Sequence, residues 1–542
     1  MKLFERFKKL MARVSDNTTA LAADMKVSRE FKDIFELGGV PAFNQFYNFG
    51  IFPWKYVYRG FYKVWHIIKA PTIMNPDATR QLAYLNIAKA LTSELAGMVW
   101  SDQCEVNLTT DGLADTDQDK LHDFVAKVLE ENNFNTKMLE AIEQAAALGG
   151  EALKVWYEVK HDADGNEIPN SGRIKIGYCM ADQFVPTAWD NAEVTEGVFV
   201  QRTAKNGYYY TRLEWHKWNA LTYVITNELY KAEISPNGTE TQDILGFRYP
   251  LNALYPYLDE STELQGFEKS LFSYFRTPTA NNLDDNSPLG ISIYANAMDT
   301  LHAIDIAYDS FVREFRLGKK RIIVPSRMVK HVIDPVTGNR VRYFDATDET
   351  YEALSTDDPD SLHIQDNSVE LRVEEHVAGI NAFLNILCLQ VGLSAGTFSF
   401  DAKNGLKTAT EVVSENSKTY KTVKNFQNMI KPAIVRLVEN IIAVASLYDL
   451  EYDGEKIESL AQKGYEVSIV LDDGITQDRQ TNINEGMALV NAKLMSKKTF
   501  LTDPKYGQGL TEEQADKELQ RIAAENQVNA INVDLMNMET AE

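Results

Sequence analysis

The segment that decides the fold reads GISIYANAMDTLHAIDIAYDSFVREFRLGKKRIIVP and runs from Gly290 to Pro325. Its large apolar side chains recur every three or four residues, which predicts one apolar stripe along a helix: Leu301, Ile304, Tyr308, Phe311 and Phe315. We expect this helix within 289–317, over about 25 residues or roughly 37 Å at 1.5 Å per residue. A long helix with so narrow a stripe usually packs beside other long helices.

Acidic and basic residues separate the two ends of the segment. Asp299, Asp305 and Asp309 lie off the apolar stripe, whereas the basic cluster Lys319–Arg321 follows the predicted helix. The strand-like residues RIIVP come next. The pattern therefore predicts a packed helix with an acidic flank, followed by a basic strand.

Length and composition indicate a protein of several subdomains. The chain has 542 residues, of which 44% are hydrophobic and 25% charged, and a single core rarely serves more than about 300 residues. No run of 18 apolar residues occurs, so we expect no membrane contact through a spanning helix. Three cysteines without a CxxC pair, Cys104, Cys179 and Cys388, indicate reduced thiols instead of disulfides or a zinc site.

The net charge of −23 excludes broad, tight binding to nucleic acid, because most of the surface repels phosphates. Charge is also divided locally. Residues 319–343 hold seven Lys or Arg and one Asp, a net of +6, and residues 345–375 hold eleven acids and one Arg, a net of −10. Any contact with DNA is therefore expected to be local and weak.

The rest of the chain predicts an alternation of helices and antiparallel strands. A helix is expected to end at Gly149–Gly150, and residues 173–232 show the period-two pattern of a meander. Short strands follow the opening helix. Further helices are expected from about Val377 to Val391 and from Thr408 to Leu447, the latter broken or kinked near Pro432.

Sequence motifs for catalysis are absent. The chain contains no GxxxxGK[ST], HExxH or GxSxG motif, and no GxGxxG after a strand. Asp115, Asp117 and Asp119 begin like a calcium loop, but Lys120 replaces its required glycine and Ala126 its final glutamate. We therefore predict no enzyme activity, no metal and no cofactor.

Five segments in a fixed order resemble the portal proteins of tailed bacteriophages, the dodecameric head-to-tail connector family. They are NIAKALTSELAGMVW, AALGGEALKVWY, the opening segment, LNILCLQVGLSAGTFSFD with TATEV, and LDDGITQD. The likeness extends from about Pro76 to Ala524. Each segment alone is unremarkable, and the specificity comes from their order and spacing.

The resemblance implies an α+β, multi-subdomain portal fold. Its parts would be an N-terminal arm (1–30), the first part of a mixed α/β wing (31–288), and two long stem helices (289–317 and 377–393) with a small β-containing clip between them (318–376). A tunnel loop (394–408), a long kinked helix with a wing strand (409–474) and a helical C-terminal crown (475–542) would follow.

The resemblance also implies a function in the virion. A ring of identical subunits, commonly twelve, would form the channel for DNA packaging and ejection at one capsid vertex. It would bind the major capsid protein, a scaffold, the terminase large subunit and a head–tail adaptor, and double-stranded DNA would pass through with weak, non-specific contact. Assembly is expected in the host cytoplasm, without a membrane.

Three groups of residues are candidates for contacts in such a ring. The tunnel loop combines glycines, which permit movement, with lysines for brief phosphate contact; its candidates are Phe398, Phe400, Lys403, Asn404 and Lys407. The clip candidates, for neighbouring subunits or the adaptor, are Lys319, Lys320, Arg321, Arg327, Lys330, Arg340 and Arg342. The stem candidates for facing the channel are Asp299, Asp305 and Asp309.

Two other readings remain open from the sequence. A minor head or scaffold protein would bind the capsid without forming a channel, and only the symmetry of the assembly separates it from a portal. A cytosolic multidomain hydrolase would fit the 57 aromatic residues and 78 acids. That reading requires a pocket with two carboxylates about 5 to 9.5 Å apart.

Overall fold

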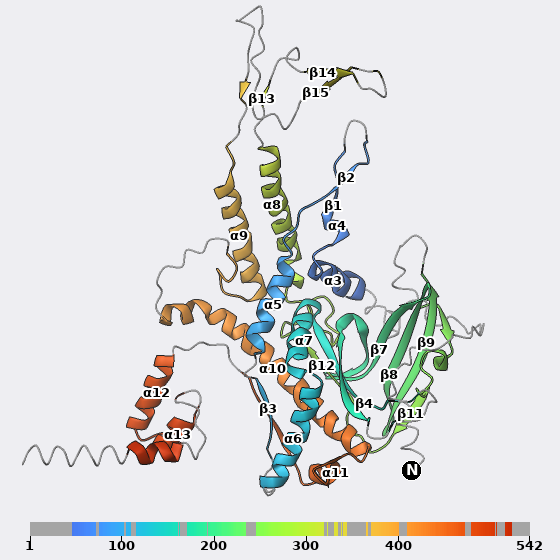
Figure 1. Ribbon diagram of the computed structural model, residues 1–542, viewed down its shortest axis with the longest axis vertical. Helices are drawn as coiled ribbons and strands as arrows, with labels where there is room; N and C mark the ends of the chain where they lie inside the picture. The colour runs from blue at the N-terminus through green and yellow to red at the C-terminus, as the bar shows by residue number, and fades with distance from the viewer. Residues whose placement is uncertain are drawn as a thin grey trace, which may run out of the picture.

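The computed structural model describes residues 46–71, 75–101, 104–109, 115–160, 162, 168, 171–191, 193–234, 245–318, 322–323, 330–333, 338, 340–343, 365–366, 370–399, 409–471, 479–503, 506 and 515–522. Figure 1 shows a broad body of helices and sheets with two helices projecting from it side by side. We call these two helices, α8 (Met298–Leu317) and α9 (Val373–Val391), the stem, as a name for this projection. The mixture of helices and sheets confirms the predicted α+β class.

The helical layer of the body contains α5 (Ile87–Val99), α6 (Asp115–Glu131) and α7 (Phe134–Leu148). Helix α7 ends as predicted, because Gly149 adopts a left-handed φ of 99°. In addition, a Cβ at Gly149 would lie 2.2 Å from the carbonyl oxygen of Gly290. Glycine is therefore required at position 149 both for the turn and for the close approach of the segment that contains Gly290.

Two antiparallel sheets form the other layer of the body. The three-stranded sheet has the order β12-β4-β5, and the larger sheet has the order β10-β9-β8-β7-β6 with β11 also paired to β9. Their bounds are β4 (Gly150–Glu158), β5 (Arg173–Met180), β6 (Phe184–Asp190), β7 (Glu193–Lys205), β8 (Tyr208–Asn219), β9 (Thr222–Glu233), β10 (Phe247–Tyr249), β11 (Ser261–Leu264) and β12 (Phe272–Arg276). The predicted meander is confirmed for β6 to β9, whereas β5, at the start of the predicted range, pairs with β4 in the smaller sheet.

The turn between β7 and β8 shows why the meander could be predicted. Lys205 pairs with Tyr208, so the loop has only two residues. Asn206 and Gly207 have φ values of 52° and 79°. Two positive φ angles are typical of a type I′ hairpin turn, and Asn-Gly is the dipeptide that favours it most.

The longest helix, α10 (Ala409–Leu447), is continuous for 39 residues with Pro432 inside it. The expected break at this proline is therefore absent. The helix packs on β12, β4 and α5, and its buried row includes Ile430, Ile434, Leu437 and Ile441. After the β17–β18 hairpin (Glu451–Tyr452, Glu455–Lys456) and α11 (Ile457–Ala461), strand β19 (Glu466–Val470) pairs with β3 (Glu105–Thr109).

The first stem helix is shorter than predicted, because residues 290–297 belong to the body. Ile293 N–H donates to the carbonyl of Ala146, and the hydroxyl of Thr277 donates to the carbonyl of Ile291 at 2.6 Å. Helix α8 therefore begins at Met298 and has 20 residues, or roughly 30 Å of length. The second stem helix begins at Val373, four residues before the expected position.

The N-terminal described elements lie between the body and the stem. They are η2 (Tyr47–Ile51), α3 (Phe52–Tyr58), α4 (Lys63–His66), β1 (Ile67–Lys69) and β2 (Thr79–Gln81). Strands β1 and β2 form an antiparallel hairpin, which Figure 1 shows beside α8. Short helices η3 (Ala181–Gln183), η4 (Leu251–Ala253) and η5 (Ala295–Ala297) join elements of the body. The predicted arm, 1–30, lies outside the described residues.

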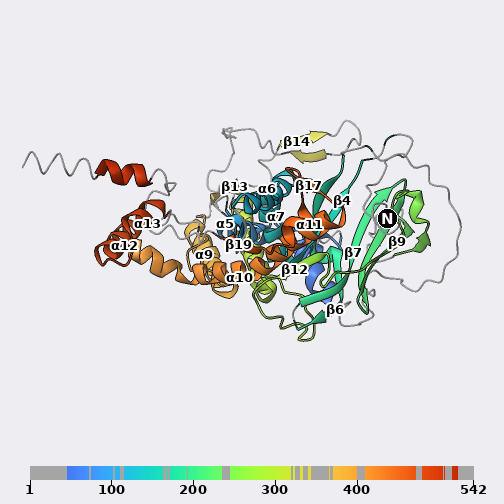
Figure 2. The ribbon, with the colours of Figure 1, turned by 90° about the horizontal axis from the view of Figure 1, so that it is seen from below.

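Between the stem helices the structure describes only short strands. They are β13 (Ile322–Ile323) paired with β16 (Gln365–Asp366), and β14 (Lys330–Ile333) paired with β15 (Arg340–Tyr343). At the other end of the chain, α12 (Arg479–Asn491), α13 (Lys497–Thr502) and a helix at 515–522 follow. Figure 2 shows α12 and α13 on the side of the body opposite β7 and β9. No described helix is long and apolar enough to cross a membrane.

Candidate functional site at the stem

The apolar stripe of α8 is divided along its length. Leu301 and Ile304 are buried in the core of the body, and Phe311 is half-buried. Phe315, one turn further on, has an exposed fraction of 47%. The prediction of a packed stripe is confirmed for the half of the helix that lies against the body. The other half extends past it.

Asp305 joins α8 to the N-terminal elements. Its carboxylate accepts hydrogen bonds from the Nε2 of His66 at 3.0 Å and from the backbone N–H of Leu85 at 3.0 Å. The N–H of Tyr62 donates to the Nδ1 of His66 at 2.9 Å, so Nδ1 carries no proton and Nε2 is the donor. His66 is held between its own helix and the stem.

Asp309, one turn further along α8, makes a second junction. Both nitrogens at the tip of Arg80 donate to its two oxygens, at 2.9 and 2.7 Å, and the N–H of Ala83 donates at 3.0 Å. Burial alone raises the pKa of Asp309. The hydrogen bonds from Arg80 and Ala83 outweigh it, and the pKa lies below its ordinary value.

We call α4, β1, β2 and residues 82–85 the brace, because Asp305 and Asp309 hold these elements along the stem. The imidazole of His302 also stacks on Trp65 of the brace, with ring centroids 4.9 Å apart. Both carboxylates are buried, and their oxygens point to donors of the same chain. Among the three stem candidates only Asp299 is exposed. That any of the three faces a channel stays a prediction, and for Asp305 and Asp309 the observed role is to hold the brace.

Near its C-terminal end, α8 is joined to α9 and not to the brace. Arg372, just before α9, donates from its Nε and Nη2 to the two oxygens of Glu314 at 3.1 and 2.9 Å, and His376 lies 3.7 Å away. These hydrogen bonds lower the pKa of Glu314 to about 2. The ring of Phe311 contacts His376 at 5.6 Å. The two stem helices are thus joined where the clip was predicted to begin.

The start of the predicted tunnel loop is bound to α10. The N–H of Ser394 donates to the hydroxyl of Thr419 at 2.9 Å, and that hydroxyl donates to the Ser394 hydroxyl at 3.0 Å. Gly396 N–H donates to the side-chain oxygen of Asn385 at 3.0 Å. Phe398 is partly buried against the core. The other four loop candidates, Phe400, Lys403, Asn404 and Lys407, lie outside the described residues.

The clip candidates are described in part. Lys330, Arg340 and Arg342 lie in the hairpin β14–β15, where Lys330 is paired with Tyr343 and Arg342 with His331. Lys319, Lys320, Arg321 and Arg327 lie outside the described residues. The short strands expected after the opening helix are confirmed by β13, β14 and β15.

Sequence reasoning missed His66 and Arg80, the basic partners of the stem carboxylates. They lie 239 and 229 positions from Asp305 and Asp309, and no local pattern connects residues so far apart. The neighbouring residues Lys55, Arg59, Lys63 and Lys69 are also basic, so nothing local sets these two apart. Within the described part of the chain, no cluster of three His, Cys, Asp or Glu residues is placed to hold a metal.

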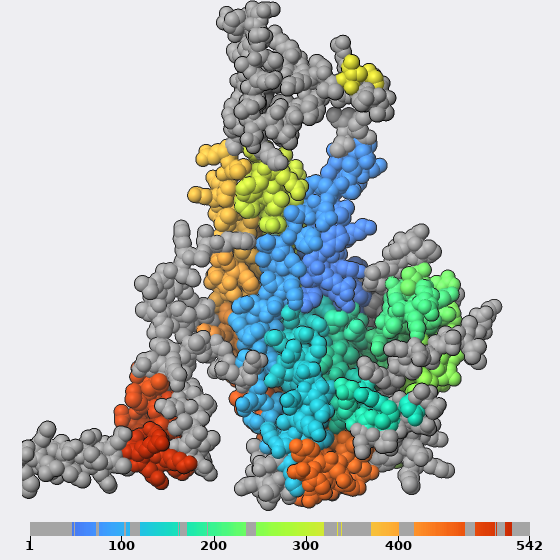
Figure 3. Space-filling model, in the orientation of Figure 1, coloured from blue at the N-terminus to red at the C-terminus, as the bar shows by residue number. Residues whose placement is uncertain are grey.

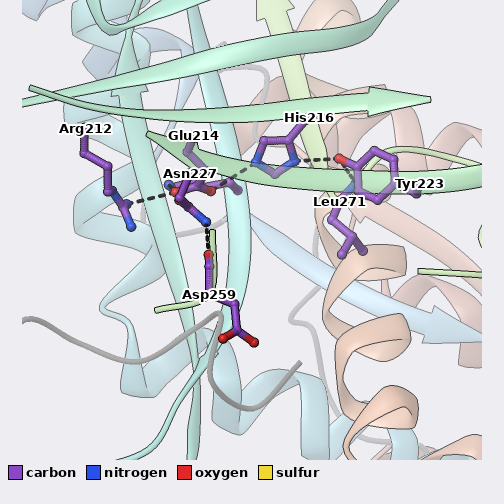
Figure 4. A network of polar contacts seen from close by, with 8 residues as sticks. Arg212, Glu214, His216, Tyr223, Asn227, Asp259 and Leu271 are labelled. Atoms are coloured by element: carbon purple, nitrogen blue, oxygen red, sulfur yellow. Dashed lines mark hydrogen bonds and ion pairs between the residues drawn. The ribbon is translucent and has the colours of Figure 1, made fainter. Parts of the chain in front are cut away.

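A second polar network lies inside the body, between its two sheets (Figure 4). Leu271 N–H donates to the hydroxyl of Tyr223 at 3.1 Å, and Tyr223 contacts the Nδ1 of His216 at 2.6 Å. The Nε2 of His216 lies 3.0 Å from Glu214, which also binds Lys154 and Arg212 at 2.8 Å each. Burial lowers the pKa of His216, so the ring is neutral: it accepts from Tyr223 and donates to Glu214.

This network joins β8 and β9 of the large sheet to β4 and to the residue before β12. Burial raises the pKa of Glu214, but Lys154 and Arg212 outweigh it and keep the carboxylate ionised. Every polar group along the chain from Leu271 to Glu214 has a partner. The arrangement is that of a structural joint between the two sheets.

Comparison with known protein families gives a match over most of the chain. A family described as Phage portal protein, SPP1 Gp6-like, matches residues 53–530. The match includes the brace, both stem helices, the described start of the loop after α9, and α10. A search of curated proteins found no match.

Proposed function

Because the chain belongs to the SPP1 Gp6-like family of phage portal proteins, we propose that its elements divide into the parts of a portal subunit. Residues 31–288 would be the first part of the wing, 289–317 and 377–393 the stem, and 318–376 the clip. Residues 394–408 would be the tunnel loop, 409–474 the wing-crossing helix and strand, and 475–542 the crown. The arm, 1–30, would contact a partner subunit.

The observation that carries this proposal is the antiparallel stem, whose first helix is joined to both of its neighbours. Asp305 and Asp309 bind the brace near the middle of α8, and Glu314 binds Arg372 near its C-terminal end. A stem fixed in this way is a rigid element on which a ring can be built. The loop after α9 starts from a fixed point, since Ser394 is bound to Thr419 of α10.

The electrostatics support a conduit that does not retain its cargo. Each copy carries a net charge of −23, and we propose twelve copies in a ring. Affinity for a duplex depends on the number of phosphates neutralised by Lys and Arg, so such a ring favours sliding over binding. Lys403 and Lys407 of the tunnel loop would supply brief contacts.

The clip is proposed as the platform for the terminase large subunit and the head–tail adaptor. Its basic part, 319–343, and its acidic part, 345–375, differ in sign. In a head-to-tail ring the basic strand of one subunit can meet the acidic segment of the next. The wing would contact the major capsid protein and a scaffold during assembly in the host cytoplasm. The family is structural, and we assign no catalytic residue.

Symmetry of the assembly tests the proposal directly. Purified protein should form rings, seen as rotationally symmetric class averages with a central channel by negative-stain microscopy, and as a species of many subunits by mass photometry. A 61 kDa monomer at every salt concentration would contradict the portal assignment. Assemblies without a channel would favour a minor head protein.

A further inference from the structure

The apolar stripe of α8 continues beyond the surface that covers it. Leu301 and Ile304 are buried, yet Phe315 on the same stripe is 47% exposed. Phe315 contacts Phe311 with ring centroids 5.1 Å apart, but its outer side is open. Figure 3 shows α8 and α9 side by side above the body. The free half of the stem therefore leaves an aromatic side chain uncovered.

The opposite side of the stem also exposes apolar side chains. On α8, Ile306 is 47% and Leu317 54% exposed; on α9, Ile386 is 46% and Leu389 69% exposed. These residues belong to two rows with helical spacing: 299, 303, 306, 310, 313 and 317 on α8, and 375, 379, 382, 386 and 389 on α9.

The two rows lie on one side of the stem. On each helix the row is about half a turn from the buried row, at 100° per residue. The buried rows, which include Ile304 on α8 and Leu384 on α9, face the same core. The exposed rows therefore both face away from it, and we call them the outer face. Small residues in these rows, Ala303, Gly379 and Ala382, permit close approach by another chain.

We propose that Phe315 of one subunit packs on the outer face of the next subunit's stem. The inference rests on the proposed ring. A closed ring of identical copies is built from head-to-tail contacts, which require two different surfaces on each copy. The stem has two such surfaces, on opposite sides of α8. A different protein that bound to the stem would need only one of these two surfaces.

The width of the stem supports this orientation. We consider a channel just wide enough for a DNA duplex and lined by many subunits. The share of its circumference that each subunit occupies is about the diameter of one helix, roughly 10–12 Å. The brace, α8 and α9 stand in a row (Figure 1), so the row must run outward from the axis. The sides of the row, with Phe315 on one and the outer face on the other, then meet the neighbouring copies.

Cysteine cross-linking in assembled rings tests the contact. We would combine Phe315→Cys with Leu317→Cys, Arg313→Cys or Ser310→Cys, three outer-face positions that allow for a tilted stem. Positions 315 and 317 point to opposite sides of one helix, so they cannot form a disulfide within a chain. We expect oxidation of at least one double variant to give a ladder of covalent multimers up to the full ring.

Mixing distinguishes a head-to-tail contact from a symmetric one. Phe315→Cys subunits assembled together with subunits carrying only the outer-face cysteine should give covalent dimers and nothing larger. Each single variant alone should give no cross-link. Covalent dimers from one single variant alone would indicate a symmetric contact and overturn the proposal.

Phe315→Cys with Arg316→Cys is the matched control, because Arg316 is exposed on α8 but off both surfaces. The native thiols give a low background: Cys104 and Cys388 are buried, and burial raises the pKa of Cys179 to about 12. Rings that form normally but cross-link no better than this control would overturn the stem contact and leave the portal assignment intact. Wild-type protein that forms no ring would contradict the portal assignment itself.

Discussion

Two ion pairs of α8, only five residues apart, have different surroundings; we call the pair at Asp309 the body end and the pair at Glu314 the clip end. At the body end, Asp309 binds Arg80, with 8% and 30% of the two side chains exposed; at the clip end, Glu314 binds Arg372, with 14% and 67% exposed. Asp309 also accepts the N–H of Ala83, and Glu314 accepts only weakly from the Arg372 backbone at 3.4 Å. The body end is the more buried of the two pairs, and the clip end is more open to water because Arg372 is largely exposed.

This difference indicates two functions for similar chemistry. A buried carboxylate that satisfies several donors cannot be removed without leaving those donors unpaired. An exposed pair is screened by salt and is readily exchanged for water. We infer that the body end fixes the stem permanently, whereas the clip end is able to rearrange when a partner binds.

The largest effect is expected from Asp309→Ala. The variant leaves Arg80 and the N–H of Ala83 without their acceptor, and we expect the free energy of unfolding to fall by about 3 kcal/mol. Denaturant titration measures the loss, and hydrogen exchange should rise in residues 79–85. Asp299→Ala, exposed on the same helix, is the control and should change stability by less than about 0.5 kcal/mol. Equal effects of the two substitutions would remove the distinction between buried and exposed acids.

The pH dependence of this junction follows from the lowered pKa of Asp309. A carboxyl with a folded pKa below its unfolded value contributes stability that is present above the unfolded pKa. That contribution is lost as the pH falls through the folded pKa. The difference in stability between wild type and Asp309→Ala should therefore shrink only at acidic pH, below about 4.

Glu151→Gln should have a smaller effect of opposite sign. Glu151 is fully buried at the start of β4, and neither carboxyl oxygen has a hydrogen-bond partner among the described residues. Burial, with Asp182 nearby, raises its pKa well above the ordinary value, and Lys55 opposes the shift. The amide of the variant carries no charge at any pH. It therefore removes the free-energy cost of keeping the carboxyl of Glu151 protonated above its ordinary pKa. We expect a gain of about 1 kcal/mol at pH 8, within the range of single stabilising substitutions.

The sign of this effect depends on pH. A carboxyl with a raised folded pKa loses stability as the pH rises above its unfolded pKa, because the unfolded chain releases the proton first. The gain from Glu151→Gln should therefore vanish below about pH 4. Thermal unfolding from pH 4 to 8 measures the trend. A destabilised variant at pH 8 would show that burial alone, without donors, does not make this acid unfavourable.

The smallest effect is expected from Glu314→Gln at the clip end. The substitution removes the charge but keeps a side chain able to accept from Arg372. Because Arg372 is largely exposed, stability should change little at low salt and not measurably at 1 M salt. Melting temperatures at both salt concentrations check this. A loss of stability that persists at 1 M salt would show that the ion pairs of Asp309 and Glu314 contribute to stability in the same way.

Local patterns in the sequence predicted the elements better than their contacts. The end of α7 at Gly149, the Asn-Gly turn of the meander and the long helices α9 and α10 all have signals within a few residues. The predicted start of α8 was wrong, because residues 290–297 are held in the body by hydrogen bonds to Ala146 and Thr277. Such long-range contacts override local propensity and leave no periodic signal.

The candidate site was predicted in outline and missed in detail. The sequence identified Asp305 and Asp309 as unusual acids on a packed helix, but it assigned them to a channel. Their partners, His66 and Arg80, lie more than 220 positions away. Two acids on one helix face are compatible with either environment. The arrangement of the brace, which local sequence does not show, is what buries both of them.

The pairing of β3 with β19 has a consequence for synthesis on the ribosome. Glu105 pairs with Val470, so this sheet cannot close until nearly the whole chain has been made. At translation rates of about 5–20 residues per second, the intervening chain takes roughly 20–70 seconds to synthesise. During that interval α8 and α9 have already left the ribosome, and their apolar rows are complete. The late strand thus sets a delay before a finished subunit exists, a period in which exposed stem helices must avoid premature association.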